Sequence, residues 1–264
     1  MLFKKKKKVN LNAGRIIVSE NALSDRVEGY NRLKDNLIFM NADGNTKVIQ
    51  IESAVSHECK TTVASNLAVS FGFVGKKVAL VELDFRRPRA HRLFNISSEN
   101  GLVDYLLGNV EKEKVAKHTR YPNVDIITRG SSIDNPTLVF ISDKFKDYME
   151  YLRANYDYII LDCAPVLQVS DYIHISKISD GVLFLVAYGS TYKYQIADAI
   201  EELKKNDVKL LGTAFTMYDR HGNYSYRYSR YYYRYYKDYY SHYEKDDLKE
   251  SDDANLDKEN EEKK

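Results

Sequence analysis

Apolar runs alternate with amphipathic segments along most of this 264-residue chain. Short continuous apolar runs are typical of strands buried on both faces, and apolar positions three and four residues apart are typical of helices. The predicted strands cover residues 48–51, 78–84, 124–127, 156–162, 181–187 and 209–215. The predicted helices cover residues 25–40, 60–74, 138–154 and 193–205, with short helical pieces at 101–107 and 110–117. The alternation predicts an α/β domain with a doubly wound, mostly parallel sheet.

The first predicted strand leads through a short loop to Lys60 and Thr61 at the start of a helix. This is the setting of a P-loop, whose backbone N–H groups and helix N-terminus face phosphate while the lysine reaches the β- and γ-phosphates. The P-loop pattern has glycine where this chain has Ala54 and Cys59. Taken alone, Lys60 and Thr61 are therefore equally compatible with an ordinary helix start that carries a surface lysine.

Two acids follow other predicted strands, Asp84 and Asp162. In a parallel sheet, ligands bind at the carboxyl ends of the strands, so we expect both acids near Lys60. Mg²⁺ takes one or two carboxylates together with phosphate oxygens and water, and a second acid can orient or deprotonate an attacking hydroxyl. The combination predicts a Mg²⁺–nucleotide site.

Overall composition excludes several classes of protein. Lysine and arginine (40) balance aspartate and glutamate (38), which argues against a global nucleic-acid-binding field. The two cysteines, Cys59 and Cys163, form no CxxC pair, which favours a reducing cytosol over a disulfide framework or structural zinc. No apolar run approaches the ~20 residues that cross a bilayer, and the N-terminus lacks the apolar core of a signal peptide. We therefore expect a soluble cytoplasmic protein.

Charge and aromatic residues concentrate outside the predicted domain, which we place at residues 25–218. Residues 1–24 contain a five-lysine run and are expected to form a disordered basic arm, which could gain ~1 kcal/mol per lysine at an anionic membrane. Residues 219–264 are expected to be a disordered tail, whose last 21 residues carry ten acids and five lysines.

The tail contains a cluster of eleven tyrosines interleaved with arginine and lysine. Its members are Tyr224, Tyr226, Tyr228, Tyr231, Tyr232, Tyr233, Tyr235, Tyr236, Tyr239, Tyr240 and Tyr243. No helical or strand period holds across them. A sticky segment, an aromatic-basic tract for RNA or lipid, and a multi-site phosphoacceptor are all compatible with this composition, and the predicted nucleotide site nearby favours the last.

Together these motifs resemble the bacterial tyrosine kinases (BY-kinases) of capsule and exopolysaccharide synthesis, of the cytosolic type encoded apart from its membrane activator. The phosphate-loop motif SxxPGEGK[ST]T is matched at Ser53, Glu58, Lys60, Thr61 and Thr62. The motif DxDxRRPxxHxxF is matched at Glu82, Asp84, Arg86, Arg87, Pro88, His91 and Phe94, and DxxPVLxVxD at Asp162, Pro165, Val166, Leu167, Val169 and Asp171. The resemblance covers about residues 25–217 and is followed by the tyrosine cluster.

This resemblance implies a P-loop NTPase fold of the MinD/ParA-like group and an ATP- and Mg²⁺-dependent autokinase that modifies the eleven tyrosines. The implied ATP-binding residues are Ser56, His57, Glu58, Cys59, Lys60, Thr61 and Thr62. The implied catalytic residues are Lys60, Asp84 and Asp162, and the implied metal site comprises Thr61, Asp84, Asp162 and Glu82.

The resemblance also implies partners. They are a membrane activator or polysaccharide copolymerase and, before phosphorylation, further copies of the chain in a ring; no nucleic acid is implied. The protein would then lie at the inner face of the cell membrane through its partner, without a transmembrane segment of its own. The family's ring-forming helix motif ExxRxxR is represented here by Glu28, Asn31 and Lys34.

Departures from the family motif leave further hypotheses open. His57 and Cys59 replace glycines, and Glu82 replaces an aspartate, so a weakened pseudokinase that acts as a regulatory binding partner is the alternative function. A partitioning-type ATPase is disfavoured, because its P-loop usually carries an early second lysine, where this chain has Ala-Val-Ser at 54–56. Cys59 is the basis of a separate hypothesis. A thiol at a helix N-terminus beside Lys60 is expected to have a lowered pKa, so that its oxidation or alkylation would block the phosphate pocket.

Overall fold

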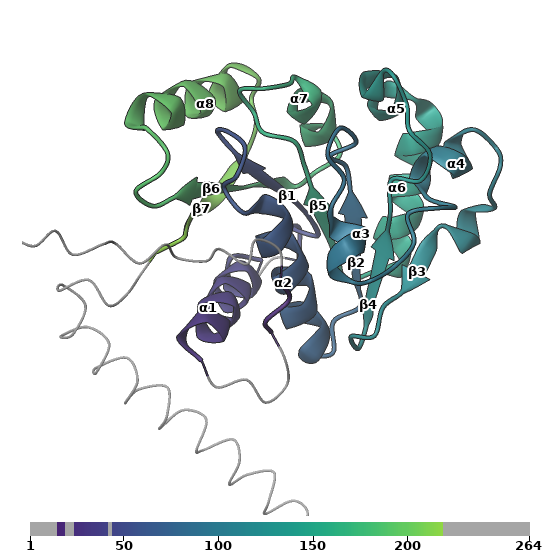
Figure 1. Cartoon of the computed structure of the whole chain (residues 1–264), viewed down its shortest axis with the longest axis horizontal. Coiled ribbons are helices and arrows are strands. Elements are labelled where there is room, and N and C mark those ends of the chain that lie inside the picture. Colours follow the sequence, from purple (N-terminus) through teal and green to yellow (C-terminus); the bar gives the residue numbers. More distant parts are fainter. Residues whose placement is uncertain (1–14, 19–23, 42–43, 219–264) are drawn as a thin grey trace, which may run out of the picture. The chain divides into compact units, whose positions relative to one another are not determined.

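A computed structural model describes residues 15–18, 24–41 and 44–218 of the chain. Its centre is a seven-stranded sheet in the order β3-β4-β2-β5-β1-β6-β7 (Figure 1). The strands are β1 (Val48–Ser53), β2 (Val78–Glu82), β3 (Ala116–His118), β4 (Val124–Ile127), β5 (Tyr158–Asp162), β6 (Gly181–Ala187) and β7 (Leu210–Thr216). All neighbours pair in parallel except β3 and β4, which are antiparallel. The predicted doubly wound, mostly parallel sheet is confirmed.

Helices cover both faces of the sheet. Helices α1 (Asp25–Met40) and α2 (Lys60–Phe73) lie on one face, where α2 packs on side chains such as Ile49 and Ile160. The strand residues next to these, such as Val48 and Ile159, point to the other face. That face is covered by α4 (Leu102–Leu106), α5 (Pro136–Ile141), α6 (Asp143–Asn155), α7 (Asp171–Ser176) and α8 (Lys193–Lys205). Because both faces are covered, β1, β2 and β5 are buried along their whole length.

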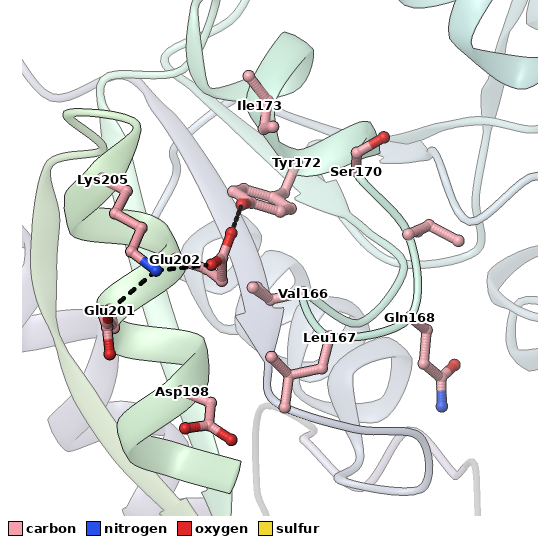
Figure 2. Close-up of a pocket in the computed structure, with 11 residues that line it drawn as sticks. Val166, Leu167, Gln168, Ser170, Tyr172, Ile173, Asp198, Glu201, Glu202 and Lys205 are labelled. Atoms are coloured by element: carbon pink, nitrogen blue, oxygen red, sulfur yellow. Dashed lines mark hydrogen bonds and ion pairs between the residues drawn. The ribbon is translucent and has the colours of Figure 1, made fainter.

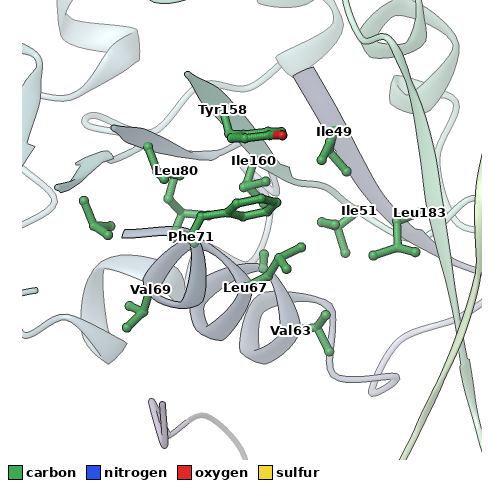
Figure 3. Packing of buried hydrophobic residues seen from close by; sticks show 14 of the residues in the cluster. Ile49, Ile51, Val63, Leu67, Val69, Phe71, Leu80, Tyr158, Ile160 and Leu183 are labelled. Atoms are coloured by element: carbon green, nitrogen blue, oxygen red, sulfur yellow. The ribbon is translucent and has the colours of Figure 1, made fainter. Parts of the chain in front are cut away.

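Helix α2 is buried on almost every side. Figure 3 shows its Leu67 and Phe71 against the sheet, where the Phe71 ring stacks on Tyr158 with ring centroids 4.2 Å apart. The Ser70 hydroxyl donates to Asn31 of α1, so α1 contacts another side of α2. The helix predicted over residues 60–74 ends at Phe73 in the structure, and Val74 lies past its end and is 48% exposed.

Two predicted helical segments have a different structure. The single helix expected at 138–154 is two helices, because Ser142 takes an extended backbone (φ −71°, ψ 142°) and its hydroxyl caps α6 by accepting the Phe145 N–H at 3.2 Å. The helical piece expected at 110–117 is a short 3₁₀ helix, η1 (Lys112–Lys114), followed by β3. The edge of the sheet was available for pairing, and it takes Ala116–His118 as an antiparallel strand.

Part of the N-terminal arm is ordered against the domain. Val18 is buried, and Asn66 of α2 accepts the backbone N–H groups of Ile17 and Val18 at 2.8 and 3.2 Å. The expectation of a wholly disordered arm is therefore wrong for residues 15–18. The lysine run and the tyrosine cluster lie outside the described residues.

The described residues belong to the compact unit Met1–Met217, except Tyr218, which begins a second unit. The boundaries placed after residues 24 and 218 stay predictions. None of the described helices combines the length and the apolar character needed to cross a bilayer.

Candidate active site

The loop from Ala54 to Cys59 connects the buried strand β1 to the N-terminus of α2. No side chain caps that helix end, so the N–H groups of its first turn face the loop without a competing acceptor. Lys60, 7% exposed, donates from Nζ to the Ser53 hydroxyl at 3.0 Å, which holds the ammonium across the loop. A helix N-terminus with an ammonium group folded over it is suited to bind phosphate.

His57 and Cys59 have left-handed backbone conformations, with φ of 68° and 67°. These two positions are the ones at which the phosphate-loop motif has glycine, which takes such conformations freely. A residue with a Cβ is destabilised by about 1–2 kcal/mol in this conformation. The chain thus keeps the backbone shape of a phosphate-binding loop without its glycines.

Glu58 lies between those two residues and fixes the loop to the sheet. Its carboxylate is 2% exposed and accepts the N–H groups of Val55 at 2.8 Å and Ala187 at 3.1 Å, together with the Thr191 hydroxyl. Its backbone carbonyl accepts the hydroxyl of Thr216, the last residue of β7, at 3.2 Å. Sequence reasoning placed Glu58 in the ATP site but missed this bracing role, because all of these partners except Val55 lie more than 120 residues away.

The other predicted loop residues surround this centre. Ser56 donates its hydroxyl to Gln168 at 2.9 Å. Thr61 follows Lys60 in the first turn of α2, and Thr62 accepts the Asn66 side-chain N–H at 2.8 Å through its backbone carbonyl.

Asp84 and Asp162 are joined through their backbones. The Asp162 carbonyl accepts the N–H groups of Leu83 and Asp84 at 2.9 and 3.0 Å, which continues the pairing of β2 with β5 beyond the strand end. One Asp84 carboxylate oxygen accepts the Arg87 N–H at 3.0 Å. Charge interactions couple Asp162 to Asp84 and Lys60, so the structure brings the three predicted catalytic residues together.

The Asp162 side chain is 1% exposed, and burial raises its pKa to about 7. The neighbouring Thr61 hydroxyl and Lys60 oppose this rise, while Asp84 and Glu82 add to it. Neither carboxylate oxygen has a hydrogen-bond donor in good geometry within the described chain. A buried carboxylate that lacks a donor, next to a threonine hydroxyl, fits a Mg²⁺ ion that draws its other ligands from phosphate and water.

Among the described residues the acids do not gather into a metal cage, and this includes Glu82, Asp84 and Asp162. Within the described residues no three or more histidine, cysteine, aspartate or glutamate side chains are arranged to hold a metal ion. The nucleotide would therefore have to contribute ligands of its own.

Glu82, also predicted at the metal, has protein partners for both oxygens. They accept from His91 Nδ1 at 3.0 Å and from the Arg129 N–H at 3.1 Å. These contacts tie β2 to the short helix α3 (Ala90–Leu93) and to the residues after β4. They indicate a supporting role for Glu82, and its metal role stays a prediction.

Glu52 is a buried acid beside the site that sequence reasoning missed. It lies in β1, fully buried, and accepts the Gln50 side-chain N–H at 2.8 Å while its second oxygen has no partner among the described residues. Burial raises its pKa to about 8, against a smaller opposing effect from Gln50. The available signal was a charged residue inside an apolar strand.

The Cys59 thiol does not have the lowered pKa that the hypothesis of a reactive thiol requires. Burial raises the pKa of Cys59, and the charge of Lys60 only partly opposes that rise. The residue is half-buried at the helix start, and desolvation of the thiolate outweighs the helix end and the lysine.

Comparison with known proteins decides the family. The model of the AAA domain matches residues 46–211. The tyrosine-protein kinase YwqD of Bacillus subtilis (strain 168) is 33% identical over 201 residues, which cover 75% of this chain and 85% of that protein. The chain belongs to the bacterial tyrosine-protein kinase family.

Solved structures of this kinase family have the same fold. The kinase domain of the Escherichia coli tyrosine kinase ETK gives a TM-score of 0.72 at 27% identity, over 85% of this chain and 87% of that domain. The chimerical protein CapA2B2 gives 0.73 at 29% identity, over 76% and 88%. The septum site-determining protein MinD of Pyrococcus horikoshii OT3 gives 0.56 at 24% identity, over 66% and 72%, and shares the P-loop NTPase fold alone.

In this kinase, the residues at the ring-forming motif have partners within the chain. Glu28 pairs with Arg32 at 2.9 Å, and Asn31 accepts the Ser70 hydroxyl at 3.2 Å. The buried Lys34 forms an ion pair with Asp35, whose Oδ1 lies 3.2 Å from the lysine Nζ.

Proposed function

We propose that the chain is an ATP-dependent protein-tyrosine autokinase that phosphorylates its own C-terminal tyrosine cluster and regulates capsular or exopolysaccharide polymerisation and export. The observation that carries the proposal is the convergence of Lys60, Asp84 and Asp162 on the phosphate loop, at the carboxyl ends of β1, β2 and β5. Membership of the tyrosine-protein kinase family supports the choice of tyrosine as acceptor.

Each residue has a role that its surroundings favour. Lys60 would leave the Ser53 hydroxyl to bind the β- and γ-phosphates. Thr61 and Asp162 would hold Mg²⁺, which neutralises charge on the phosphates of bound ATP. Asp84 is less buried than Asp162 and would orient the tyrosine hydroxyl and accept its proton.

The partners follow from the same proposal. A membrane activator or polysaccharide copolymerase would hold the kinase at the inner face of the cell membrane, and the lysine run at 4–8 would add attraction to anionic lipid. Unphosphorylated copies would associate, so that one copy's tail reaches another copy's site.

The test is an autophosphorylation assay with anti-phosphotyrosine detection. Dephosphorylated full-length protein is incubated with Mg-ATP, with and without the cytoplasmic segment of its activator, beside Lys60→Met and Cys59→Gly variants. We expect signal in the wild type and in Cys59→Gly, and loss of at least a hundredfold in Lys60→Met, because the ammonium stabilises charge that develops in the transition state (on the order of 3 kcal/mol).

The contrary outcomes separate the alternatives. Signal in Cys59→Gly without signal in the wild type would mean that the loop no longer turns over and that the protein acts as a regulatory binding partner. Equal signal in the wild type and Lys60→Met would overturn the assigned site.

A further inference from the structure

A groove lies between α8 and the segment that runs from β5 to α7, with a cavity volume of about 520 Å³ (Figure 2). The apolar part of its lining, which we call the apolar floor, includes Val166, Leu167 and Ile173. The α8 side carries three carboxylates and one lysine: Asp198, Glu201, Glu202 and Lys205. The groove therefore combines an apolar floor with a net negative wall.

The carboxylates of this groove differ in their partners. Lys205 pairs with both Glu201 and Glu202, at 2.9 and 3.3 Å, and Glu202 also accepts the Tyr172 hydroxyl at 3.3 Å. One lysine thus serves two carboxylates. Asp198 is exposed and has no ion pair within the described chain. The acidic wall retains capacity for cationic groups.

The groove shares a wall with the phosphate loop. The N–H groups of Val166 and Leu167 donate to the carbonyls of Ser53 and Ala54, at 3.0 and 3.2 Å. Gln168, which also lines the groove, accepts the Ser56 hydroxyl. A chain that occupied the groove would lie against the residues that brace the phosphate loop.

One segment of this protein has the complementary chemistry. Residues 227–237 contain four basic residues, six tyrosines and no acid. We propose that the groove is a docking site for residues 227–237 of a second copy, which it holds beside the active site while a neighbouring tyrosine is phosphorylated. The guanidinium groups would pair with Asp198 and Glu201, and tyrosine rings would cover the apolar floor. This proposal rests on the proposed kinase function.

Phosphorylation of the docked segment would end its binding. Each phosphotyrosine adds about −1.5 to −2 charges. Two modified tyrosines therefore offset three to four of the segment's four positive charges, which removes most of its attraction to the acidic wall. The groove would thus select unmodified tails and release finished ones.

A binding measurement without ATP separates this proposal from catalysis. The receptor is the full chain with Arg227→Gln, Arg230→Gln and Arg234→Gln, so that its own tail does not compete. The probe is a fluorescent peptide of residues 227–237, followed by anisotropy. We expect Asp198→Asn with Glu201→Gln in the receptor to weaken binding roughly three- to tenfold, and added salt to weaken it further. A doubly phosphorylated peptide is expected to bind at least tenfold more weakly.

The matched control removes two exposed acids from another helix. Asp143→Asn with Glu150→Gln on α6 makes the same change in net charge, and we expect it to leave the peptide affinity within twofold of the unmodified receptor. Equal weakening in both double variants would mean general charge attraction and would overturn the proposal. So would absence of peptide binding in a receptor that still forms phosphotyrosine, and that result would leave the proposed kinase function intact.

Discussion

The phosphate loop balances two strained residues against one buried carboxylate. The left-handed conformations of His57 and Cys59 cost about 1–2 kcal/mol each. Glu58 makes three hydrogen bonds through a buried carboxylate, and a hydrogen bond to a charged group contributes about 1.5–3 kcal/mol. The contacts of Glu58 are therefore large enough to hold its two neighbours in conformations that they would leave in a free peptide.

The buried carboxyl of Glu52 predicts a pH dependence of the free energy of unfolding. Its pKa is about 8 in the folded protein against an ordinary value of 4.5, so between these values the folded state binds the extra proton. The free energy of unfolding should therefore fall as pH rises from 5 to 8, by up to about 1.4 kcal/mol per pH unit from this group. Asp162, whose pKa is raised to about 7, also makes the free energy of unfolding fall as the pH rises toward 7.

The measurement is urea unfolding of the nucleotide-free protein at several pH values, for wild type and Glu52→Gln. Glutamine keeps the acceptor for Gln50 and cannot ionise beside Lys60, Asp162 and Cys163. We expect a shallower pH dependence in Glu52→Gln. Parallel curves for the two proteins would show that Glu52 does not titrate in this range.

At the scale of elements, α2 and α1 allow a matched test of helix packing. Gly72 of α2 has no room for a Cβ, which would meet the Pro122 carbonyl and come within 2.6 Å of Val124 Cγ2. Gly29 of α1 has open space around the same atom. We expect Gly72→Ala to lower the free energy of unfolding by about 1–3 kcal/mol and Gly29→Ala to raise it by about 0.5–1 kcal/mol.

Denaturant unfolding of both variants checks this prediction. An opposite sign for the two changes is the required result, because only the environment differs between two glycines in helices. A neutral Gly72→Ala would mean that the chain around Pro122 moves away without cost.

The elements show where sequence patterns are informative and where they are not. The apolar runs at β1, β5 and β6 fixed both the strand positions and the parallel sheet, since strands buried on both faces leave a continuous signal. The break at Ser142 was not visible, because the apolar spacing continues across it and a single serine hydroxyl makes the cap. Strand β3 depends on its antiparallel partner β4, which no local pattern in 110–117 reveals.

In the active site, too, some features could be predicted from the sequence and others could not. Lys60, Asp84 and Asp162 could be placed together because strand ends in a parallel sheet converge. The contacts of Glu58 with Ala187 and of Glu82 with Arg129 could not, since they join residues far apart in the chain through side-chain geometry. The prediction of a lowered pKa for Cys59 is wrong, because nearby charge and position in the helix do not reveal how strongly burial desolvates the thiolate.

At the scale of the whole molecule, the division after Met217 predicts that the kinase unit folds without the tail. A chain that ends at Tyr218 should melt within about 2 °C of the full chain and bind Mg-ATP with unchanged affinity, because the core clusters all lie before residue 215. It should show no autophosphorylation signal. Calorimetry, nucleotide titration and anti-phosphotyrosine detection check these three outcomes. A large loss of melting temperature would show that the tail contributes to the folded unit.

The left-handed backbone at Cys59 also has a genetic consequence. Cysteine and glycine codons of the forms TGY and GGY differ at a single base. The residue that this conformation favours is therefore one point mutation away, and the fold already has the shape that would receive it. The replacement of His57 by glycine needs two base changes. A population selected for a less strained loop would therefore reach glycine at position 59 before position 57.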